Sequence, residues 1–430
     1  MKTNSTSLEV YLNQLYANKN KLTSLVAHPQ NGTTHTPKEI IQQPFLWRKT
    51  AALMADQAPK LKSFLTNAGL YNDQDRPNLI LTGAGTSDYV GLSLVDLLRI
   101  KLKTNCNNWP TTRITANPGA FFSDDQNHVM LHFARSGNSP ESIAVLEMAL
   151  DHFQNITHHI VITCNKNGKL VNLAKQHTDK VYTIVLDEAT NDQGLAMTSS
   201  FSNMIIAAQA LAHLDNIEQF QDLIERTATA GEYLLKTYSN LIYDLASPAL
   251  TRAFYLGNNE LLGAAAESAL KVQELTAGQI IAKGEDTMAF RHGPISAVDS
   301  NTLVCFFLSA DEFTLRYELD VLFQFRKQFH ELGTKTVVVG AQAPEKTSHN
   351  GEDESSVHYI TYDPDGKLNI PNLYQVNIQV LFGQLFGLFS SYRRDINVDD
   401  PTSGDHALYS RIVKGVRLYN WNKDKKKYAP

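Results

Sequence analysis

The sequence predicts an α/β fold made of two similar units in tandem, each a parallel sheet sandwiched by helices. Two observations predict this fold. Short apolar runs alternate with amphipathic helical stretches, as expected for strands that are buried on both faces. The alternation then repeats, because Gly257 follows Gly83 by 174 residues and Ser309 follows Ser136 by 173. A length of 430 residues also favours two or three domains over one core.

The first half begins with a polar segment, residues 1 to 35, for which the sequence predicts no function. Thr36 to Glu39 (TPKE) then forms a capping-box pattern with an early proline, which predicts a helix from about Pro37. The pair His158-His159 comes just before or at the start of an apolar run, and we expect it at a sheet edge or in a loop. Four strands are predicted in this half, over residues 78–82, 128–133, 159–163 and 181–186.

The second half repeats the pattern after a helical stretch, residues 214 to 244, where we expect the break between the two repeats. Its predicted strands are 252–256, 302–308, 336–340 and 359–362. The expected domain limits are an N-terminal extension with its lead-in helix over 1–50, a first domain over 51–225, a second over 226–400 and a C-terminal tail over 401–430.

Composition excludes several classes of function. A formal net charge of -5 argues against a broad basic surface and therefore against a nucleic-acid partner. No apolar run is long enough to span a membrane, and the N-terminus lacks the apolar core of a signal peptide. The three cysteines are far apart and the 14 histidines form no HExxH, so we expect no metal site, no cofactor and a cytoplasmic location.

Two loops at predicted strand ends have the composition of anion-binding loops. Gly83 to Ser87 (GAGTS) follows the first strand, and its glycines allow a ligand to approach the backbone while Thr86 and Ser87 offer hydroxyls. Arg135 to Glu141 (RSGNSPE) follows the second strand, and Ser139 and Pro140 suit the N-cap and first position of a helix. In a parallel sheet both loops lie at the carboxyl edge, where ligands bind. Plain helix capping is the alternative interpretation.

The predicted helix 261–275 carries three charges on an otherwise apolar surface. Glu267, Lys271 and Glu274 are spaced by four and three residues, so they share one face. A helix that is apolar almost all round is buried, and buried charges must be paired or take part in chemistry. Two carboxylates flanking an ammonium, with His292 shortly downstream, indicate an acid/base site. A solvated stripe of ion pairs is the alternative.

Together these motifs resemble those of tandem sugar isomerase (SIS) domain proteins. GAGTS, SGNSPES, ITCN, AMTSS, ESALKVQELTAG and FRHGP are all typical of that superfamily. Within it the chain is most similar to the galactosamine-6-phosphate deaminase/isomerase family, also called tagatose-6-phosphate aldose/ketose isomerase, from about Pro37 to Val416. The resemblance implies deamination of galactosamine-6-phosphate to tagatose-6-phosphate and ammonia, without a cofactor, in amino-sugar catabolism.

The resemblance also implies roles for single residues. Glu274 is the expected base that moves a proton between C1 and C2, oriented by Lys271 and Glu267. His292 is expected to assist ring opening, from a neighbouring subunit in the related glucosamine-6-phosphate synthase, which implies a homodimer or higher homo-oligomer. The sugar phosphate is expected to bind to Thr86, Ser87, Arg135, Ser136, Gly137 and Ser139. Thr198, Ser199 and Lys414 are further candidates for contacts with the substrate.

Three interpretations of the function stay open at this point. The first is the deaminating isomerase. The second is an isomerase of a neutral sugar phosphate that releases no ammonia, and the third is a sensor that binds a sugar phosphate without catalysis. Glucosamine-6-phosphate is an alternative substrate, because the sequence does not define the configuration at C4.

Overall fold

The chain forms two compact units in the computed structural model, which describes residues 7–17, 19–122, 126–344, 357–403, 417–422 and 427–429. We number the units by the order of their sheets along the chain. The first unit comprises Leu46–Asn191, Ser199–Asp222 and Ser410–Pro430. The second comprises Met1–Phe45, Asp192–Thr198 and Leu223–Tyr409. Each unit contains one five-stranded parallel sheet with helices on both faces, so the predicted fold class is confirmed.

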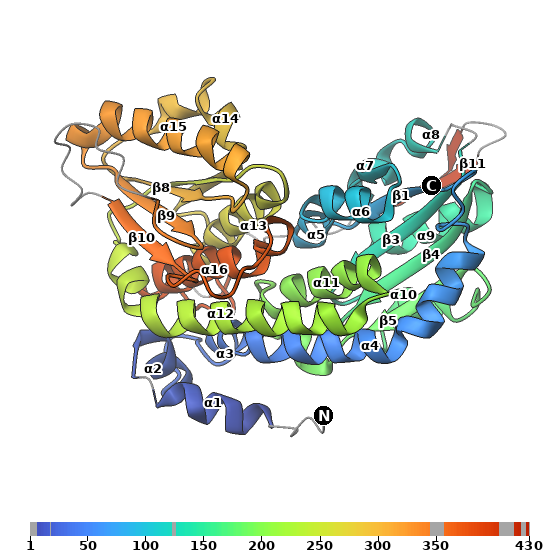
Figure 1. Cartoon of the computed structure of the whole chain (residues 1–430), viewed down its shortest axis with the longest axis horizontal. Coiled ribbons are helices and arrows are strands. Elements are labelled where there is room, and N and C mark those ends of the chain that lie inside the picture. Colours follow the sequence, from blue (N-terminus) through green and yellow to red (C-terminus); the bar gives the residue numbers. More distant parts are fainter. Residues whose placement is uncertain are drawn as a thin grey trace. The chain divides into compact units, whose positions relative to one another are not determined.

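The first sheet has the strand order β2-β1-β3-β4-β5, and all neighbouring strands are parallel (Figure 1). After β1 the chain forms β2 on one side of it and then β3 on the other side. Strands β1 and β3 are therefore neighbours in the interior of the sheet. The strands are β1 (Asn78–Thr82), β2 (Cys106–Asn108), β3 (His128–Ala134), β4 (Ile156–Thr163) and β5 (Val181–Val185).

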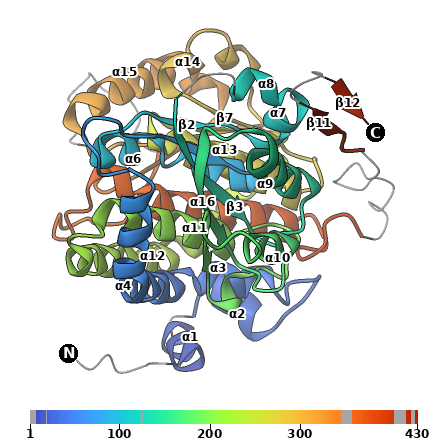
Figure 2. The same cartoon turned by 90° about the vertical axis from the view of Figure 1, so that its right-hand side faces the viewer.

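Helices cover both faces of this sheet. Apolar side chains of α7, α9 and α10 pack against one face, for example Ile114 and Val145 against Ile80 and Met130. Helices α5 and α11 contact the other face (Figure 2). The helices with their described residues in or reaching this unit are α4 (Gln43–Asn67), α5 (Thr86–Leu92), α6 (Val95–Leu102), α7 (Thr111–Ala116), α8 (Pro118–Phe121), α9 (Pro140–His152), α10 (Lys169–Ala174), η1 (Glu188–Thr190), α11 (Ser199–Gln209) and η2 (Ala210–His213), with the short antiparallel strands β11 (Asn420–Asn422) and β12 (Lys427–Ala429).

The second sheet has the order β10-β9-β8-β6-β7, which is the same topology as the first when the two sheets are compared in chain order. Its strands are β6 (Arg252–Leu256), β7 (Ile281–Glu285), β8 (Thr302–Phe307), β9 (Lys335–Gly340) and β10 (Val357–Thr361). Strand β6 follows β1 by 174 residues, and both strands are five residues long. The internal repeat predicted from the sequence therefore corresponds to a repeated sheet.

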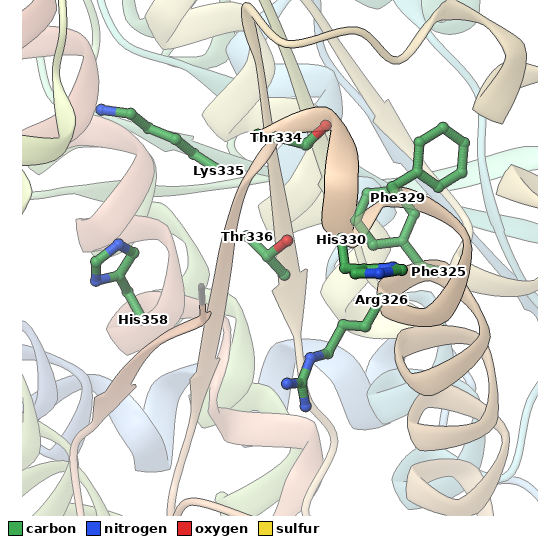
Figure 3. A pocket seen from close by; sticks show the side chains of 9 residues that line it. Phe325, Arg326, Phe329, His330, Thr334, Lys335, Thr336 and His358 are labelled. Carbon is green, nitrogen blue, oxygen red and sulfur yellow. The ribbon is translucent and has the colours of Figure 1, made fainter. Parts of the chain in front are cut away.

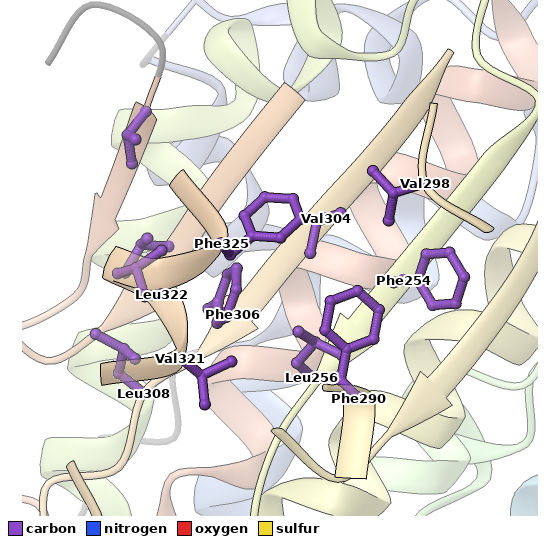
Figure 4. Packing of buried hydrophobic residues seen from close by; sticks show 12 residues of the cluster. Phe254, Leu256, Phe290, Val298, Val304, Phe306, Leu308, Val321, Leu322 and Phe325 are labelled. Carbon is purple, nitrogen blue, oxygen red and sulfur yellow. The ribbon is translucent and has the colours of Figure 1, made fainter. Parts of the chain in front are cut away.

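The core of the second unit is divided by its sheet. On one face Phe290 of α14 and Phe325 of α15 pack on Phe254, Val304 and Phe306 (Figure 4). Helices α13 and α16 pack against each other on the other face. The helices in or reaching this unit are α1 (Leu8–Tyr16), α2 (Lys21–Ala27), α3 (Thr36–Ile41), α12 (Ile217–Leu245), α13 (Glu260–Leu275), α14 (Thr287–Phe290), η3 (Pro294–Ala297), α15 (Glu312–Phe329), η4 (His330–Leu332), η6 (Asn372–Tyr374) and α16 (Val376–Tyr392).

All eight predicted strands are present, but the two parallel sheets contain two further strands that the sequence analysis did not predict. Strand β2 has only three residues, two of them polar, and none of the five residues of β7 is fully buried. Both pair with one neighbour only, at the sheet edge, so neither needs the continuous apolar run that marks a strand buried on both faces. The boundary between the units lies inside α12, and the domain limits given above stay predictions.

The predicted capping box at Thr36 is wrong, although the helix starts where expected. Thr36 is the first residue of α3, and the N-cap residue His35 makes no side-chain capping bond. The backbone N–H groups of residues 34 to 36 donate instead to the carboxylate of Asp399, at 2.6 to 3.0 Å. Glu39 turns away from the helix start and accepts the N–H of Gln193 at 2.5 Å. The carboxylate of the distant residue Asp399 thus caps the helix in place of a local side chain, and the local sequence pattern gives no sign of it.

The edge or loop position expected for His158 and His159 is also wrong. Both lie within β4, an internal strand between β3 and β5. His159 is fully buried, and its Nδ1 lies 3.1 Å from Nε2 of His132 on β3. Burial lowers the pKa of His132 to about 3, so this pair is a hydrogen-bonded pair of neutral imidazoles inside the sheet.

Candidate active site

The three charges predicted on one helix face lie on α13 of the second unit. The helix begins after Gly257, Asn258 and Asn259, at the carboxyl end of β6, and the N–H of Leu261 donates to the carbonyl of Asn258 at 2.9 Å. Gly257 is required here because a Cβ atom would lie 2.5 Å from the carbonyl oxygen of Leu261. The helix then runs back along the sheet, and most of its side chains are buried.

Lys271 contacts both glutamates of this face, Glu267 and Glu274. Lys271 Nζ lies 2.6 Å from Glu274 Oε2 and 3.4 Å from Glu267 Oε1. The side chains of Lys271 and Glu267 are fully buried, whereas that of Glu274 is 18% exposed. We call these three residues the α13 triplet. It holds one positive and two negative charges when all three groups are ionised, and Glu274 is the member that solvent or a ligand can reach.

His292 belongs to the same unit but stands apart from the triplet. It follows α14, its backbone N–H donates to the carbonyl of Ala289 at 2.9 Å, and its side chain is exposed. Gly293 after it has a φ of 132°, which turns the chain sharply into η3. Within the described part of the chain, no hydrogen bond or ion pair joins the His292 ring to Glu274.

The first predicted anion-binding loop starts α5 of the first unit. Gly83 packs so closely on the start of this helix that a Cβ atom would lie 2.4 Å from the backbone of Ser87. Gly85 is the N-cap residue, with φ 57° and ψ -126°, a conformation that glycine adopts readily. Thr86 and Ser87 follow in the first turn and are buried. The loop therefore presents the N-terminal turn of a helix at a strand end, as the sequence predicted.

The second loop starts α9 at the end of β3. Ser136 and Ser139 are half-buried, and Gly137 between them has a φ of 62°. Ser139 is the N-cap residue, but its hydroxyl makes no capping bond and donates to Glu141 Oε2 at 2.8 Å. The predicted N-cap position of Ser139 is therefore confirmed, although its hydroxyl bonds to Glu141 and not to the helix backbone.

A residue from a third strand end supports this loop. The side-chain amide of Asn165 donates to the carbonyl of Ser136 at 2.9 Å, and the N–H of Leu170 donates to the carbonyl of Gly137, also at 2.9 Å. Sequence reasoning did not assign Asn165 or Glu141 to the site. The ITCN motif contains Asn165, but only the fold shows that it contacts Ser136, because β3 and β4 are neighbours in the sheet.

The remaining candidates have different positions. Arg135 is half-buried at the end of β3. Thr198 and Ser199 are both fully buried, and the Thr198 hydroxyl donates to Asp192 Oδ1 at 3.1 Å. Lys414 lies outside the described residues.

Two cavities differ in their position relative to the predicted site. One of 640 Å³ in the first unit is lined by Glu141 of the α9 loop, by residues of α7 and by Arg417 to Tyr419. It therefore adjoins the second of the two predicted anion-binding loops.

A smaller cavity of 190 Å³ lies in the second unit, between the end of α15 and the start of β9 (Figure 3). It is at the amino end of the strands, the edge opposite to Asn258. Arg326 and His330 lie on the α15 side of β9 in Figure 3, whereas Lys335 and His358 extend on its other side. These four basic side chains do not converge, so we do not assign an anion site to them.

Among the residues that the structure describes, no three His, Cys, Asp or Glu side chains gather as a metal ligand set would. No helix in the same described ranges is both long and apolar enough to cross a membrane.

Two parallel five-stranded sheets of the same strand order, each flanked by helices, are the architecture of tandem SIS-domain proteins. A model of the SIS domain matches residues 74–214. D-galactosamine-6-phosphate deaminase AgaS from Escherichia coli is 31% identical over 390 residues, which cover 90% of this chain and 96% of that protein. The protein of the same name from Shewanella sp. (strain ANA-3) is 31% identical over 409 residues, covering 94% and 96%. The chain belongs to the D-galactosamine-6-phosphate deaminase AgaS family of SIS-domain proteins.

The likeness extends to three-dimensional structure. The crystal structure of tagatose-6-phosphate ketose/aldose isomerase from Escherichia coli superposes with a TM-score of 0.78 at 29% identity. The superposition covers 92% of this chain and 98% of that one. The family resemblance inferred from the motifs is thus confirmed along most of the sequence.

Proposed function

We propose that this protein is an enzyme that converts galactosamine-6-phosphate and water into tagatose-6-phosphate and ammonia. The observation that carries the proposal is the α13 triplet, in which a buried lysine holds a partly exposed glutamate at 2.6 Å. Related proteins named galactosamine-6-phosphate deaminase support the choice of substrate.

In this proposal Glu274 is the general base. It removes the proton from C2 of the open-chain amino aldose and returns it to C1, so that one carboxylate serves both carbons. The product is a ketose imine at C2, which water hydrolyses to the ketone and ammonia. Lys271 orients Glu274 and balances its charge, and Glu267 fixes Lys271 from the buried side.

The phosphate group is proposed to bind to the two loops of the first unit. Ser87, Ser136 and Ser139 would donate hydroxyl hydrogen bonds, with Thr86, Arg135 and the Gly137 N–H beside them. Ser139 would then exchange its present acceptor, Glu141, for a phosphate oxygen. Thr198 and Ser199 are buried, so we propose that they support the substrate site through backbone position.

His292 is proposed to open the sugar ring at the site of a neighbouring copy, which makes a homo-oligomer part of the proposal. The exposed position of its side chain supports this role. Mixing unfolded Glu274→Gln and His292→Asn chains and refolding them together should restore activity that neither variant has alone. Additive residual activities would place both groups in one chain.

A second candidate is an isomerase that acts on a neutral sugar phosphate and releases no ammonia. The name of the superposed structure, tagatose-6-phosphate ketose/aldose isomerase, favours this alternative. The α13 triplet suits both reactions, since the proton transfer between C1 and C2 is common to them.

The deciding experiment measures ammonia and ketose phosphate together from galactosamine-6-phosphate, glucosamine-6-phosphate and neutral aldose 6-phosphates. We expect equal amounts of both products from galactosamine-6-phosphate. Glu274→Gln should lower kcat at least about 10²-fold while the substrate still binds. Glu147→Gln, an exposed glutamate on α9, is the matched control. Ketose phosphate without ammonia would favour the plain isomerase, and binding without turnover would favour the sensor.

We propose a cytoplasmic location for the protein. All three cysteines are buried as free thiols, as is usual in a reducing compartment. Fractionation of the native host with an antibody against the protein tests this placement.

A further inference from the structure

Strand β7 is the most exposed edge strand of the two parallel sheets. Each sheet has two edge strands, which are β2 and β5 in the first unit and β10 and β7 in the second. Every residue of β2, β5 and β10 is buried or half-buried. In β7, by contrast, Lys283 is exposed and Ile281 is 63% exposed. A large apolar residue on an open edge favours pairing with another chain.

The backbone of β7 presents hydrogen-bonding groups at this edge. The N–H of Ile281 donates to a carbonyl just before β6 at 2.9 Å, and the carbonyl of Glu285 accepts an N–H just after β6 at 3.1 Å. The odd-numbered residues of β7 therefore bond to β6, and the even-numbered residues Ala282 and Gly284 direct their N–H and C=O groups outward. In the described part of the chain, no strand pairs with this outer side of β7.

The charges of β7 suit pairing with a second copy of the same strand. Lys283 and Glu285 lie on one face of the strand, where their side chains form an ion pair at 2.5 Å. Gly284 between them faces α13, because a Cβ atom there would lie 2.4 Å from the backbone nitrogen of Ala266. When two such strands pair antiparallel about a two-fold axis at Gly284, each Lys283 lies opposite the partner's Glu285. The outward N–H and C=O groups of the two Gly284 residues then bond to each other.

Glu274 and His292 lie near opposite ends of this strand. Helix α13 runs antiparallel to β7, since Ala266 packs on the second half of the strand and Gln273 accepts the N–H of Ala282 at 3.4 Å. Glu274 is therefore near the amino end of β7. His292 follows α14, which starts two residues after the carboxyl end of β7. A five-residue strand spans about 16 Å, so β7 separates the two groups within one chain.

We propose that the open edge of β7 is an interface with a second copy of this chain, paired antiparallel about Gly284. Antiparallel pairing places the carboxyl end of one strand beside the amino end of the other. The partner's His292 thereby comes to the end of α13 that carries Glu274, and two-fold symmetry repeats the contact in reverse. Only this last step rests on the proposed function, in which His292 of one copy serves the base of the other.

The test is an exchange of charges across this interface. Lys283→Glu sets like negative charges opposite each other at two places in the dimer, and Glu285→Lys sets like positive charges there. Each variant alone should have a dimer dissociation constant at least about tenfold higher than the wild type. An equimolar mixture of the two variants should associate again, because every pair across the two-fold axis then has opposite charges. Sedimentation equilibrium at low salt measures the association.

Lys327→Glu, a charge reversal at an exposed position of α15, is the matched control and should associate as the wild type does. An ion pair that matters only within one chain is lost in both interface variants, and mixing them does not restore it. A monomeric wild type, unchanged association of the single variants, or a mixture that stays dissociated would overturn the proposal. None of these measurements uses turnover, so they fail or succeed separately from the release of ammonia.

Cysteine cross-linking provides a second measurement if the charge variants do not fold. The three native cysteines are buried, so cysteines introduced by Lys283→Cys and Glu285→Cys are the accessible thiols in the described part of the chain. Oxidation of the mixed variants should yield covalent dimers. Either variant alone should cross-link far less, because identical positions do not lie opposite each other in this register. Equal cross-linking in all three samples, or none, would contradict antiparallel pairing about Gly284.

Discussion

The two units have the same strand order but carry different chemistry on the helix that follows their first strand. In the second unit this helix contains Glu267, Lys271 and Glu274. The residues 174 positions earlier are Ser93, Leu97 and Ile100, and the helix of the first unit is interrupted there between α5 and α6. The charged residues of the α13 triplet thus have no charged counterparts at the corresponding positions of the first unit.

The loops at the strand ends differ in the opposite sense. In the first unit, hydroxyl side chains and Arg135 lie in these loops. In the second unit, the buried carboxylate of Glu318 contacts the loop after β8, and Asp286 and Asp311 are near it. This difference in charge agrees with the proposal that the sugar phosphate binds to the loops of the first unit. The comparison teaches that one topology supplies the same loops and helix start twice, and we propose that the first unit binds the phosphate while the second supplies the general base.

The largest expected effect is on stability, from Lys271→Met in the second unit. The change leaves the buried carboxylate of Glu267 without its charge partner, which should cost about 3–5 kcal/mol of unfolding free energy. The double variant Lys271→Met/Glu267→Gln should recover part of this loss in unfolding free energy, which urea unfolding measures. Leu97→Met, at the corresponding position of the first unit, should cost below about 1.5 kcal/mol. Equal losses from Lys271→Met and Leu97→Met would mean that the α13 triplet is not a buried ionic cluster.

Substitutions of Ser136 and Ser309, which lie at corresponding strand ends, should have different effects, one on substrate binding and the other on stability. Ser136→Ala should raise KM for the phosphorylated substrate, by a factor equivalent to about 1.5–3 kcal/mol for one lost hydrogen bond to a charged group. Adding Ser87→Ala should raise KM further. Ser309→Ala should lower stability through its lost bond to Asn372 and leave KM unchanged. Similar KM values for Ser136→Ala and Ser309→Ala would contradict the assignment of the phosphate to the first unit.

The units should also respond to pH in opposite directions. Burial lowers the pKa of His132 to about 3, so below pH 6.5 the unfolded chain binds more protons and the first unit loses stability. That loss should reach about 2 kcal/mol at pH 5 for this histidine.

Burial raises the pKa of Glu39 to about 8 and that of Glu318 to about 7. The folded second unit therefore holds protons that the unfolded chain releases above pH 4.5, and its stability should fall as pH rises toward 8. Hydrogen exchange of peptides from β3 and β8, corrected for intrinsic rates, should show these opposite trends between pH 5 and 8. If exchange in both peptides changed in the same direction with pH, the predicted difference between the units would be contradicted.

The smallest expected effect concerns the two N-cap residues. Asn259 has the backbone conformation that Gly85 has in the other unit, and with φ 52° this costs an asparagine more than a glycine. Asn259→Gly should stabilise the protein by about 1 kcal/mol. Gly85→Ala should destabilise it by a similar amount because of the positive φ, and no clash is added since a Cβ atom at Gly85 meets no atom within 4 Å. Thermal unfolding of both variants measures this, and a loss of stability in Asn259→Gly would show that its side chain has another role.

The sequence by itself determined the fold class, eight of the strands, the repeat and the residues that form the α13 triplet. These features follow from short-range regularities, because strand burial requires apolar runs and a spacing of three or four residues aligns side chains on a helix. The bonds within the triplet are therefore local, between residues seven positions apart at most.

Only the tertiary structure decided the contacts between distant segments. Glu318 reaches Asn258 across 60 residues, Asp399 caps α3 across more than 360, and the edge strands β2 and β7 form through pairing with a neighbour. A carboxylate or an edge strand whose hydrogen-bond partner is distant in the chain produces no periodic sequence pattern in its own segment. The free energy of such a contact depends on burial and geometry that exist only once the sheets have assembled.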